Sequence, residues 1–501
     1  MLSYLNNIFS WYITKRIFQI EYFRKNPIEV QKKTLLNLLY KAKNTEIGVK
    51  YKFSTINTYS DFKNRIPLCK YDDIEVDIKR LYKGEENIFW PGKIKWFASS
   101  SGTSSGKSKL IPISKDSLIE CHYKGGKDLL ALYYTSNPKT QLFKGKHLIL
   151  GGNTKLTYSD QKSYYGDLSA IIIDNLPWWC EWRRTPKKEI TLLENWEEKI
   201  KAIAETSIND DVHILAGVPS WTLALLNYIL KQNSTDNIND IWPNLELYFH
   251  GGINFSPYKQ QFSNIIQNSN MNYVQTYNAT EGLFAVQDIL GNEDMLLMLD
   301  YGIFYEFIAI EDLDTENTIL LEDVKLEKKY AMIISSNTGL WRYFIGDTIV
   351  FTNLSPFRII VVGRTHEYLN TFGEKLITDN SDKAIEYAMK KTNSSLIEYS
   401  VAPIYMNNKN AGAHQWVIEF KKPPDNIEYF TKMLDNKLKS LNSDYKIKRT
   451  KDLTLKKPLI TIVNNGSFYK WMKNRNKLGG QNKVPRLSNS RKYIDEIIAL
   501  S

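Results

Sequence analysis

The sequence predicts an α/β protein, with a large mixed α/β N-terminal domain and a smaller α+β C-terminal domain. The chain has 501 residues, more than a single hydrophobic core usually serves. Short apolar runs typical of strands alternate with helical stretches between residues 94 and 360, which favours a mixed α/β domain. The pattern changes near residues 365–377, where a compact unit of helices and strands begins. We place the two domains at residues 1–368 and 369–501.

The first 50 residues favour helices that dock on the N-terminal domain. Apolar side chains recur close to helical spacing between Met1 and Lys25, and residues 26–50 continue with a broad apolar stripe. Lys15 and Arg16 interrupt the first apolar run, so we do not expect a signal peptide here. A basic amphipathic helix also suits a membrane surface, but docking on its own domain is the more common outcome. The chain has no run of about 18 apolar residues, so we expect no transmembrane segment.

Apolar runs bounded by glycine or polar turns predict the strands of both domains. In the first domain these runs are residues 95–98, 110–113, 147–150, 212–215, 245–250, 273–277 and 357–362. In the second domain we expect strands at residues 396–404, 415–420 and 459–463, and helices at residues 382–391 and 427–441. In a sheet of this kind the strand ends present the ligand-binding groups.

The composition is that of an ordinary folded protein with many aromatic residues. The net charge of +11, from 66 basic and 55 acidic residues, is spread along the chain, so we do not expect nucleic-acid binding. Three cysteines without a C-x-x-C spacing indicate a reducing compartment, and we expect a cytoplasmic protein. The six histidines include no H-x-x-x-H pair, which argues against a dedicated zinc site. Magnesium remains possible because it needs only one carboxylate besides the phosphates of its ligand.

The segment Ser99–Lys109 is the strongest local signal for phosphate binding. It combines hydroxyl groups, glycines and lysines between two predicted strands, and such a loop offers backbone and side-chain donors to an anion. A P-loop needs four residues between its two glycines, but only three separate Gly102 from Gly106. The alternative of a flexible serine–glycine linker fits poorly with the flanking strands. We therefore expect a hairpin that holds phosphate with a different loop.

Four further segments carry candidate site residues, each with an ordinary alternative. Tyr277–Gly282 places Thr280 and Glu281 after a predicted strand; the alternative is a capping pair at the start of a helix. Asn337–Asp347 ends in an aspartate that suits ribose hydroxyls, or is simply a turn residue. Gly363–Asn370 contains a basic residue at the domain boundary, and Leu478–Arg486 contains a lysine on a glycine-flanked loop. Alone, the third is an ordinary loop and the fourth a solvated tail.

Taken together and in order, these motifs resemble the auxin-responsive acyl acid-amido synthetases. That family (the auxin-responsive promoter family) belongs to the wider adenylate-forming superfamily of acyl-CoA ligases and luciferases. The similarity extends over nearly the whole chain. Besides the segments above, it includes Lys109, Pro112, Gly166–Ser169, Asn175–Pro177, Gly217–Trp221 and His250–Gly252. Two positions depart from the family pattern: Ala279–Thr280, where relatives often have serine before the glutamate, and His366 at the hinge, where the wider superfamily commonly has Asp or Lys.

The resemblance implies a role for each candidate residue. ATP and Mg²⁺ are the implied cofactors, and the C-terminal domain is implied to be mobile. Glu281 would hold Mg²⁺, Thr280 would touch the α-phosphate, and Lys483 would complete the adenylation site as a catalytic residue. Asp347 and Arg364 would bind ribose. The remaining implied nucleotide-binding residues are Ser100, Ser101, Gly102, Thr103, Ser104, Gly251, Gly252, Tyr277 and Asn278.

The resemblance further implies an ATP-dependent ligase that joins a carboxylic acid to an amine, expected to be an amino acid. It would form an acyl-adenylate and pyrophosphate, and then transfer the acyl group with release of AMP. Two alternatives stay open: an acyl-CoA ligase with the same first step, and a nucleotide-binding scaffold without turnover. The sequence identifies neither the acid nor the amine, nor the oligomeric state. Four tryptophans are candidates for the acyl slot, although core packing is their commoner fate: Trp178, Trp179, Trp182 and Trp221.

Overall fold

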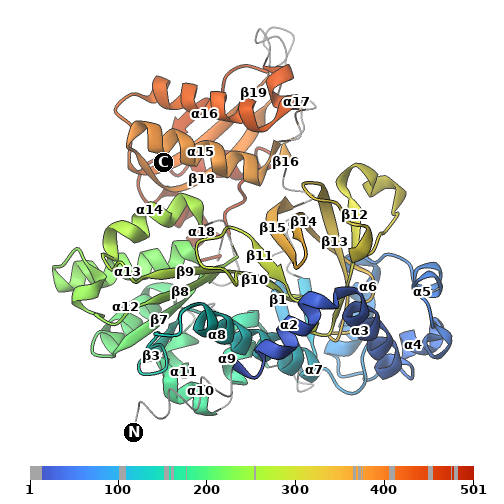
Figure 1. Cartoon of the computed structure of the whole chain (residues 1–501). Helices are drawn as coiled ribbons and strands as arrows, with labels where there is room; N and C mark the ends of the chain where they lie inside the picture. Colours follow the sequence, from blue (N-terminus) through green and yellow to red (C-terminus); the bar gives the residue numbers. More distant parts are fainter. Residues whose placement is uncertain are drawn as a thin grey trace. The chain divides into compact units, whose positions relative to one another are not determined.

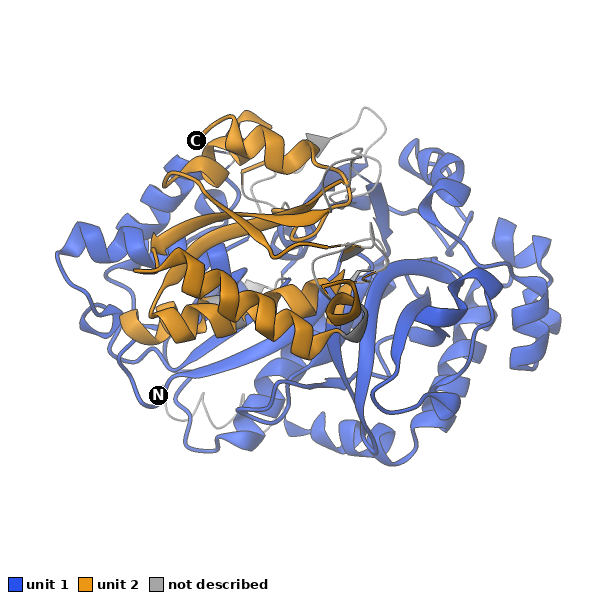
Figure 2. Ribbon diagram, turned by 90° about the horizontal axis from the view of Figure 1, so that it is seen from above, with its two compact units in different colours: residues 1–253, 266–361 blue, residues 254–265, 362–501 orange. Residues whose placement is uncertain are grey.

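The computed structural model describes most of the chain and divides it into two compact units (Figures 1 and 2). The described residues are 14–100, 109–151, 157–158, 163–176, 178–193, 195–252, 255–364, 368–369, 374, 376–405, 412–449, 455–475, 477–478 and 483–501. The large unit comprises residues 1–253 and 266–361, and the small unit comprises residues 254–265 and 362–501. Helix α14 (Ser256–Ile265) therefore groups with the small unit, which the sequence did not predict. The predicted boundary at 368/369 stays a prediction.

The large unit is built on a sheet with the strand order β12-β13-β14-β15-β11-β10-β9-β8-β7-β3-β6. One half is parallel and alternates with helices such as α12 (Trp196–Ser207) and α13 (Pro219–Asn233), as the sequence predicted. Helices that connect parallel strands cover the sheet faces, so these strands are rich in buried apolar residues. The parallel strands are β3 (Lys146–Ile149), β6 (Arg184–Thr185), β7 (Val212–Gly217), β8 (Leu247–Gly251) and β9 (Asn272–Ala279).

The other half of this sheet is antiparallel and differs from the predicted alternation. Its strands follow one another through turns and 3₁₀ segments, so no α-helix lies between them. Strand β12 is buried along its whole length under α3, and its apolar run gives no period-2 signal. The antiparallel strands are β10 (Gly282–Val286), β11 (Met295–Leu297), β12 (Ile303–Ala309), β13 (Lys329–Ser336), β14 (Tyr343–Leu354) and β15 (Phe357–Arg364).

A second, four-stranded sheet contains the predicted hairpin around the serine-rich loop. Strands β1 (Trp96–Ser100) and β2 (Lys109–Ile113) pair antiparallel, with Ser100 opposite Lys109. Strands β5 (Tyr164–Gly166) and β4 (Thr157–Tyr158) complete the order β2-β1-β5-β4. The hairpin is confirmed, whereas residues 101–108 between its strands lie outside the described residues.

The N-terminal helices dock on the large unit over the described part of this segment. Ile20 and Phe23 of α2 (Ile17–Lys25) are buried in the same core as Leu38 of α3 (Pro27–Ala42). No helix in the described ranges is long and apolar enough to cross a membrane. The other α-helices of this unit are α4 (Glu46–Lys50), α5 (Tyr59–Arg65), α6 (Tyr71–Tyr82), α7 (Lys115–Ser117), α8 (Lys124–Ser136), α9 (Leu168–Asp174), α10 (Trp178–Arg183) and α11 (Lys188–Thr191).

The small unit is an α+β sandwich, close to the predicted elements. Its sheet has the order β18-β19-β20, and helices α15 (Thr378–Thr392) and α16 (Ile427–Leu441) cover one face (Figure 1). Trp416 and Ile418 of β19 pack toward these helices, and Val417 packs with α18 and α19 on the other face, as period-2 alternation requires. The remaining elements are β16 (Tyr368–Leu369), β17 (Leu376–Ile377), β18 (Ser395–Ile404), β19 (Ala413–Lys422), β20 (Leu459–Ile462), α17 (Ser443–Lys448), α18 (Ser467–Asn474) and α19 (Lys492–Ile498).

Candidate active site

Strands β7, β8 and β9 bring the predicted glycines to one edge of the large sheet. The strands are parallel, so their carboxyl ends share an edge, and Gly251 lies opposite Thr276. A Cβ atom on Gly251 would lie 2.6 Å from the Thr276 carbonyl oxygen, so no larger residue fits there. Gly252 has a φ of +83°, which other residues rarely adopt. Close packing against β9 therefore requires glycine at position 251, and the backbone conformation favours it at position 252.

Thr280 and Glu281 form the tight turn between β9 and β10. The pairing of Ala279 with Gly282 leaves these two residues at the tip of a β-hairpin. The alternative of a helix-capping pair is therefore wrong. Both residues are buried, with 4% and 7% of their surfaces exposed. A buried carboxylate at the carboxyl edge of a sheet is placed to meet a cation or a hydrogen-bond donor.

A bulge in β14 directs Asp347 toward the same region. Ile333 of β13 pairs with Phe344 and Ala331 pairs with Thr348, so residues 345–347 of β14 lie opposite Met332 alone. Gly346 within this bulge has a φ of +90°. Bulges commonly redirect a side chain next to a functional site. Asp347 is thus a strand residue, and the alternative of a simple turn aspartate is wrong.

A hydrogen bond joins two of the predicted motifs, although 70 positions separate them in the chain. The Tyr277 hydroxyl donates to Asp347 Oδ2 at 2.8 Å, and both side chains are buried. The Tyr277 ring lies 4.9 Å from that of Phe284 on β10, which fixes the position of its hydroxyl. The motif around Tyr277 and the motif that ends at Asp347 therefore meet at one place in the large unit.

Glu281 interacts electrostatically with Tyr343, which also interacts with Tyr71. Burial, followed by the charge of Glu281, raises the pKa of the Tyr343 phenol well above its usual value, and so do Cys69 and Tyr71 nearby. The Tyr71 hydroxyl accepts a hydrogen bond from the backbone N–H of Leu110 at 3.0 Å. Tyr71 thus ties helix α6 to the strand that follows the serine-rich loop. Sequence reasoning missed Tyr71 because it lies on an ordinary amphipathic helix without a local motif.

Lys109 adds a cation to this part of the large unit. Its Nζ atom lies 5.4 Å from the centre of the Tyr71 ring, within the range of a cation–π contact. The family resemblance already pointed to this lysine, which follows the serine-rich loop. Through Tyr71, Lys109 is connected to the residues that interact electrostatically with Tyr343.

The remaining predicted residues fall in other places or outside the described residues. Lys483 belongs to the small unit and is exposed, and Asn278 is exposed at the end of β9. Ser100 and Arg364 are the last residues of β1 and β15, and only their backbone is described. The other predicted loop residues lie outside the described residues: Ser101, Gly102, Thr103 and Ser104. Their roles stay predictions.

Glu281 is the candidate for a Mg²⁺ site. No group of three or more His, Cys, Asp or Glu side chains able to hold a metal occurs within the described ranges. Mg²⁺ commonly binds one or two carboxylates together with phosphate oxygens. The buried carboxylate of Glu281, on a hairpin at the carboxyl edge of the sheet, fits that pattern.

Of the tryptophans that were candidates for the acyl slot, one packs between helices and another is exposed to solvent. Trp221 of α13 has its ring centre 5.4 Å from that of Trp196 on α12, so it packs between helices. Trp182 is 54% exposed. Core packing therefore accounts for Trp221, and the side chains of Trp178 and Trp179 lie outside the described residues.

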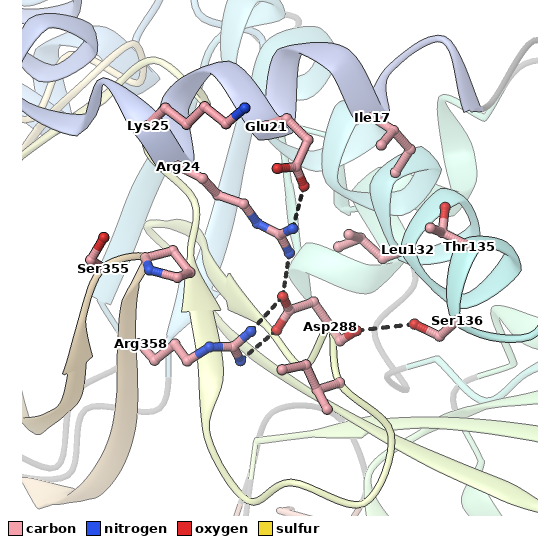
Figure 3. Close-up of a pocket in the computed structure, with 12 residues that line it drawn as sticks. Ile17, Glu21, Arg24, Lys25, Leu132, Thr135, Ser136, Asp288, Ser355 and Arg358 are labelled. Carbon is pink, nitrogen blue, oxygen red and sulfur yellow. Dashed lines mark hydrogen bonds and ion pairs between the residues drawn. The ribbon is translucent and has the colours of Figure 1, made fainter.

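A second charged cluster of the large unit, which we call the Asp288 cluster, lines a separate pocket (Figure 3). Arg358 of β15 donates two hydrogen bonds to the Asp288 carboxylate, at 2.7 and 2.8 Å, and Arg24 of α2 binds the same carboxylate. Arg358 also contacts Asp294 at 3.2 Å. The Asp288 side chain is 1% exposed, so its charge is neutralised inside the protein. We assign this cluster to structure, because it attaches the N-terminal helix to the sheet.

Comparison with solved structures identifies the fold. The chain is similar to a GH3.15 acyl acid amido synthetase, with a TM-score of 0.79 and 18% identity over 97% of this chain and 96% of that one. It is also similar to a 2-hydroxyisobutyryl-CoA ligase in the postadenylation state, with a TM-score of 0.57 and 11% identity over 94% and 92% of the two chains. The fold is that of the adenylate-forming enzymes, which confirms the predicted fold class.

Comparison of sequences then identifies the family. Residues 16–271, 296–364 and 379–492 match the models of the GH3 family N-terminal, central and C-terminal domains. The chain therefore belongs to the GH3 family. An indole-3-acetic acid-amido synthetase, GH3.4 of Arabidopsis thaliana, is 25% identical over 93% of this chain and 90% of its own length. The resemblance stated from the motifs is confirmed, and the predicted ligase class agrees with the names of these relatives.

Proposed function

We propose that this protein is an ATP-dependent acyl acid-amido synthetase. The observation that carries the proposal is the hydrogen bond between Tyr277 and Asp347, because it joins two predicted nucleotide-binding motifs beside the Glu281 hairpin. The family membership and the names of the relatives support the same reaction class. The acceptor is an amine, as in the amido synthetases that the chain resembles.

In the first step, a carboxylate oxygen of the acid attacks the α-phosphorus of ATP. A P–O bond forms to the acid, the bond to the pyrophosphate oxygen breaks, and pyrophosphate leaves. The glycines at the edge of β8 accommodate the base, Asp347 and Arg364 hold the ribose, and the serine-rich loop and Thr280 hold the phosphates. Two anions must approach each other in this step, so positive charge near the α-phosphate stabilises the transition state. Lys483 supplies that charge from the small unit.

Mg²⁺ bound by Glu281 and the ATP phosphates would neutralise part of the same charge. The chain's own contribution is to hold this carboxylate ready. The hairpin turn fixes the backbone of Glu281, and its buried side chain interacts electrostatically with Tyr343.

In the second step, the nitrogen of the amine attacks the acyl carbon of the adenylate. A C–N bond forms, the C–O bond to AMP breaks, AMP leaves as the anion, and the amine loses a proton. AMP is already a good leaving group, so this step does not need the lysine of the small unit. Movement of that unit about residues 365–370 would withdraw Lys483 and admit the amine.

The remaining predictions complete the proposal. The substrates are a small carboxylic acid and an amino acid, and the cofactors are ATP and Mg²⁺. We propose a cytoplasmic location because the three cysteines are all unbridged, as in proteins of reducing compartments.

The test is acid-dependent exchange between ATP and pyrophosphate across a panel of carboxylic acids. We expect exchange with a subset of acids and, with that acid and pooled amino acids, an amide detected by mass spectrometry together with AMP. Formation of a thioester with coenzyme A and no amide would favour the acyl-CoA ligase. Binding of ATP without acid-dependent AMP release would favour a scaffold without turnover.

A further inference from the structure

The chain directly after Lys483 adds a short strand to the edge of the small unit's sheet. The backbone N–H of Val401 on β18 donates to the carbonyl oxygen of Arg486 at 2.9 Å, and the N–H of Ser488 donates back to the Val401 carbonyl at 3.0 Å. The Ser400 hydroxyl donates to the carbonyl of Pro485 at 2.7 Å. Residues 485–488, which we call the anchor strand, are therefore fixed by backbone bonds on both sides of Val401.

Arg486 makes the strongest side-chain contacts of the anchor strand. Its guanidinium forms an ion pair with Glu398 and donates to the Tyr399 carbonyl at 3.0 Å. A further N–H donates to the Tyr258 hydroxyl of α14 at 3.0 Å. The guanidinium also lies 4.5 Å from the centre of the Tyr399 ring. Arg486 is 9% exposed, so these contacts are shielded from solvent.

These contacts fix the register of the anchor strand along β18. Leu487 is 2% exposed in the core that α15 and α16 share with the sheet. A slip of one residue would move the strand by about 3.3 Å, which would withdraw Leu487 from this core and Arg486 from Glu398. A planar guanidinium with several donors resists such a slip better than a single ammonium group does.

We infer that Arg486 is the positioning residue that sets where Lys483 can act; the inference rests on the proposed role of Lys483 in adenylation. Only Val484 and Pro485 separate the two residues. Three residues of extended chain span about 10 Å, so a shift of the anchor strand passes directly to Lys483. A displacement of about 1 Å in a catalytic group can cost about 100-fold in rate.

Arg486→Lys tests the inference, with Arg491→Lys as the matched control. Arg491 also ties this part of the chain to the sheet, through the Pro403 carbonyl at 3.0 Å and Gln415 at 2.8 Å, but it lies outside the anchor strand. We expect Arg486→Lys to lower kcat for adenylation about 10- to 100-fold. KM for ATP, aminolysis of a supplied acyl-adenylate, and all rates of the control should stay within about twofold. Equal losses in adenylation and aminolysis would overturn the inference.

The double variant Lys483→Ala with Arg486→Lys separates positioning from a direct effect. Because Arg486 acts through Lys483, the double variant should adenylate at the rate of Lys483→Ala alone. A further loss of tenfold or more would overturn the inference. If Arg486→Lys does not fold, the double variant Arg486→Met with Glu398→Gln takes its place in the same assays, because it removes both charges of the ion pair. We expect the same losses from it.

Amide hydrogen exchange of residues 486–488 gives a readout that needs no turnover. We expect at least tenfold faster exchange in Arg486→Lys, or in the charge-free pair if that is the one that folds, and no change in Arg491→Lys. Unchanged exchange at these amides would overturn the inference even if the enzyme is active. A wild-type protein that shows no acid-dependent pyrophosphate exchange would instead reject the proposed function, and hydrogen exchange would still decide whether Arg486 holds the strand.

Discussion

Two buried aspartates of the large unit, Asp288 and Asp347, accept hydrogen bonds from different kinds of donor. Asp288 is held by the guanidinium groups of Arg24 and Arg358, so cations of its own unit neutralise it. Asp347 accepts a hydrogen bond from the neutral phenol of Tyr277, in a bulge near the strand edge that carries Gly251. Asp288 is thus part of an ion-pair cluster that holds the fold together, whereas Asp347 is the aspartate that we propose to bind a ligand.

The largest expected effect comes from breaking the Asp288 cluster. Arg358→Met leaves a buried carboxylate without its bidentate partner, which typically costs about 3–5 kcal/mol in the free energy of unfolding. Urea unfolding followed by circular dichroism measures this loss. At a temperature where the variant is still folded, its KM for ATP should equal that of the wild type. A specific rise in that KM would show that the cluster belongs to the nucleotide site and would remove the contrast between the two aspartates.

The second prediction concerns Lys483, the cation of the small unit that we propose to act in adenylation. Lys483→Ala should lower pyrophosphate exchange about 100- to 1000-fold, because one preorganised charge at a transition state commonly contributes that much. Aminolysis of a supplied acyl-adenylate should proceed at the wild-type rate. Lys477→Ala, a neighbouring lysine of the same unit, serves as the control. Equal losses in both half-reactions would reject the proposed role of Lys483.

The third prediction concerns His122, a buried histidine whose titration makes the stability of the fold depend on pH. Burial lowers the pKa of His122 to about 4, and its Nε2 atom has no hydrogen-bond partner among the described residues. In the unfolded chain the pKa of this histidine is about 6.5. Between pH 6.5 and pH 4 the unfolded state is therefore protonated at His122 while the folded state is not. His122 therefore destabilises the fold as the pH falls from about 6.5 toward 4, by about 1.4 kcal/mol at pH 5.5.

His122→Leu removes this titration and tests the third prediction. The difference in unfolding free energy between pH 7.5 and pH 5.5 should be smaller in the variant by about 1.4 kcal/mol, as measured by urea unfolding at the two pH values. An identical pH dependence in the two proteins would mean that His122 does not titrate differently in the folded state.

For the candidate active site around Tyr277 and Asp347, the sequence predicted the individual strands better than the order in which they pair. The strands before Gly251 and Tyr277 were predicted because each is a short apolar run that ends in glycine or a polar turn. The antiparallel order of β10 to β15 was missed, since the buried run of β12 resembles a buried parallel strand. The bulge at Asp347 depends on which residues of β13 lie opposite it, and the pair Asp288–Arg358 joins residues 70 positions apart. Such pairings belong to the folded sheet and leave no local pattern.

The smallest expected effect tests the hydrogen bond between Tyr277 and Asp347, which we propose to lie in the nucleotide site. Tyr277→Phe keeps the ring against Phe284 but removes the hydrogen bond to Asp347, which is worth about 1 kcal/mol, so KM for ATP should rise about fivefold with kcat nearly unchanged. Tyr305→Phe is the matched control, because it removes a buried phenol that donates to the Met298 carbonyl at 3.0 Å, within the hydrophobic core of the same unit. Both variants lose a similar amount of stability, so different KM values would show that the Tyr277–Asp347 pair belongs to the nucleotide site. Equal KM values in steady-state assays would place Asp347, like Asp288, among the residues that serve the fold.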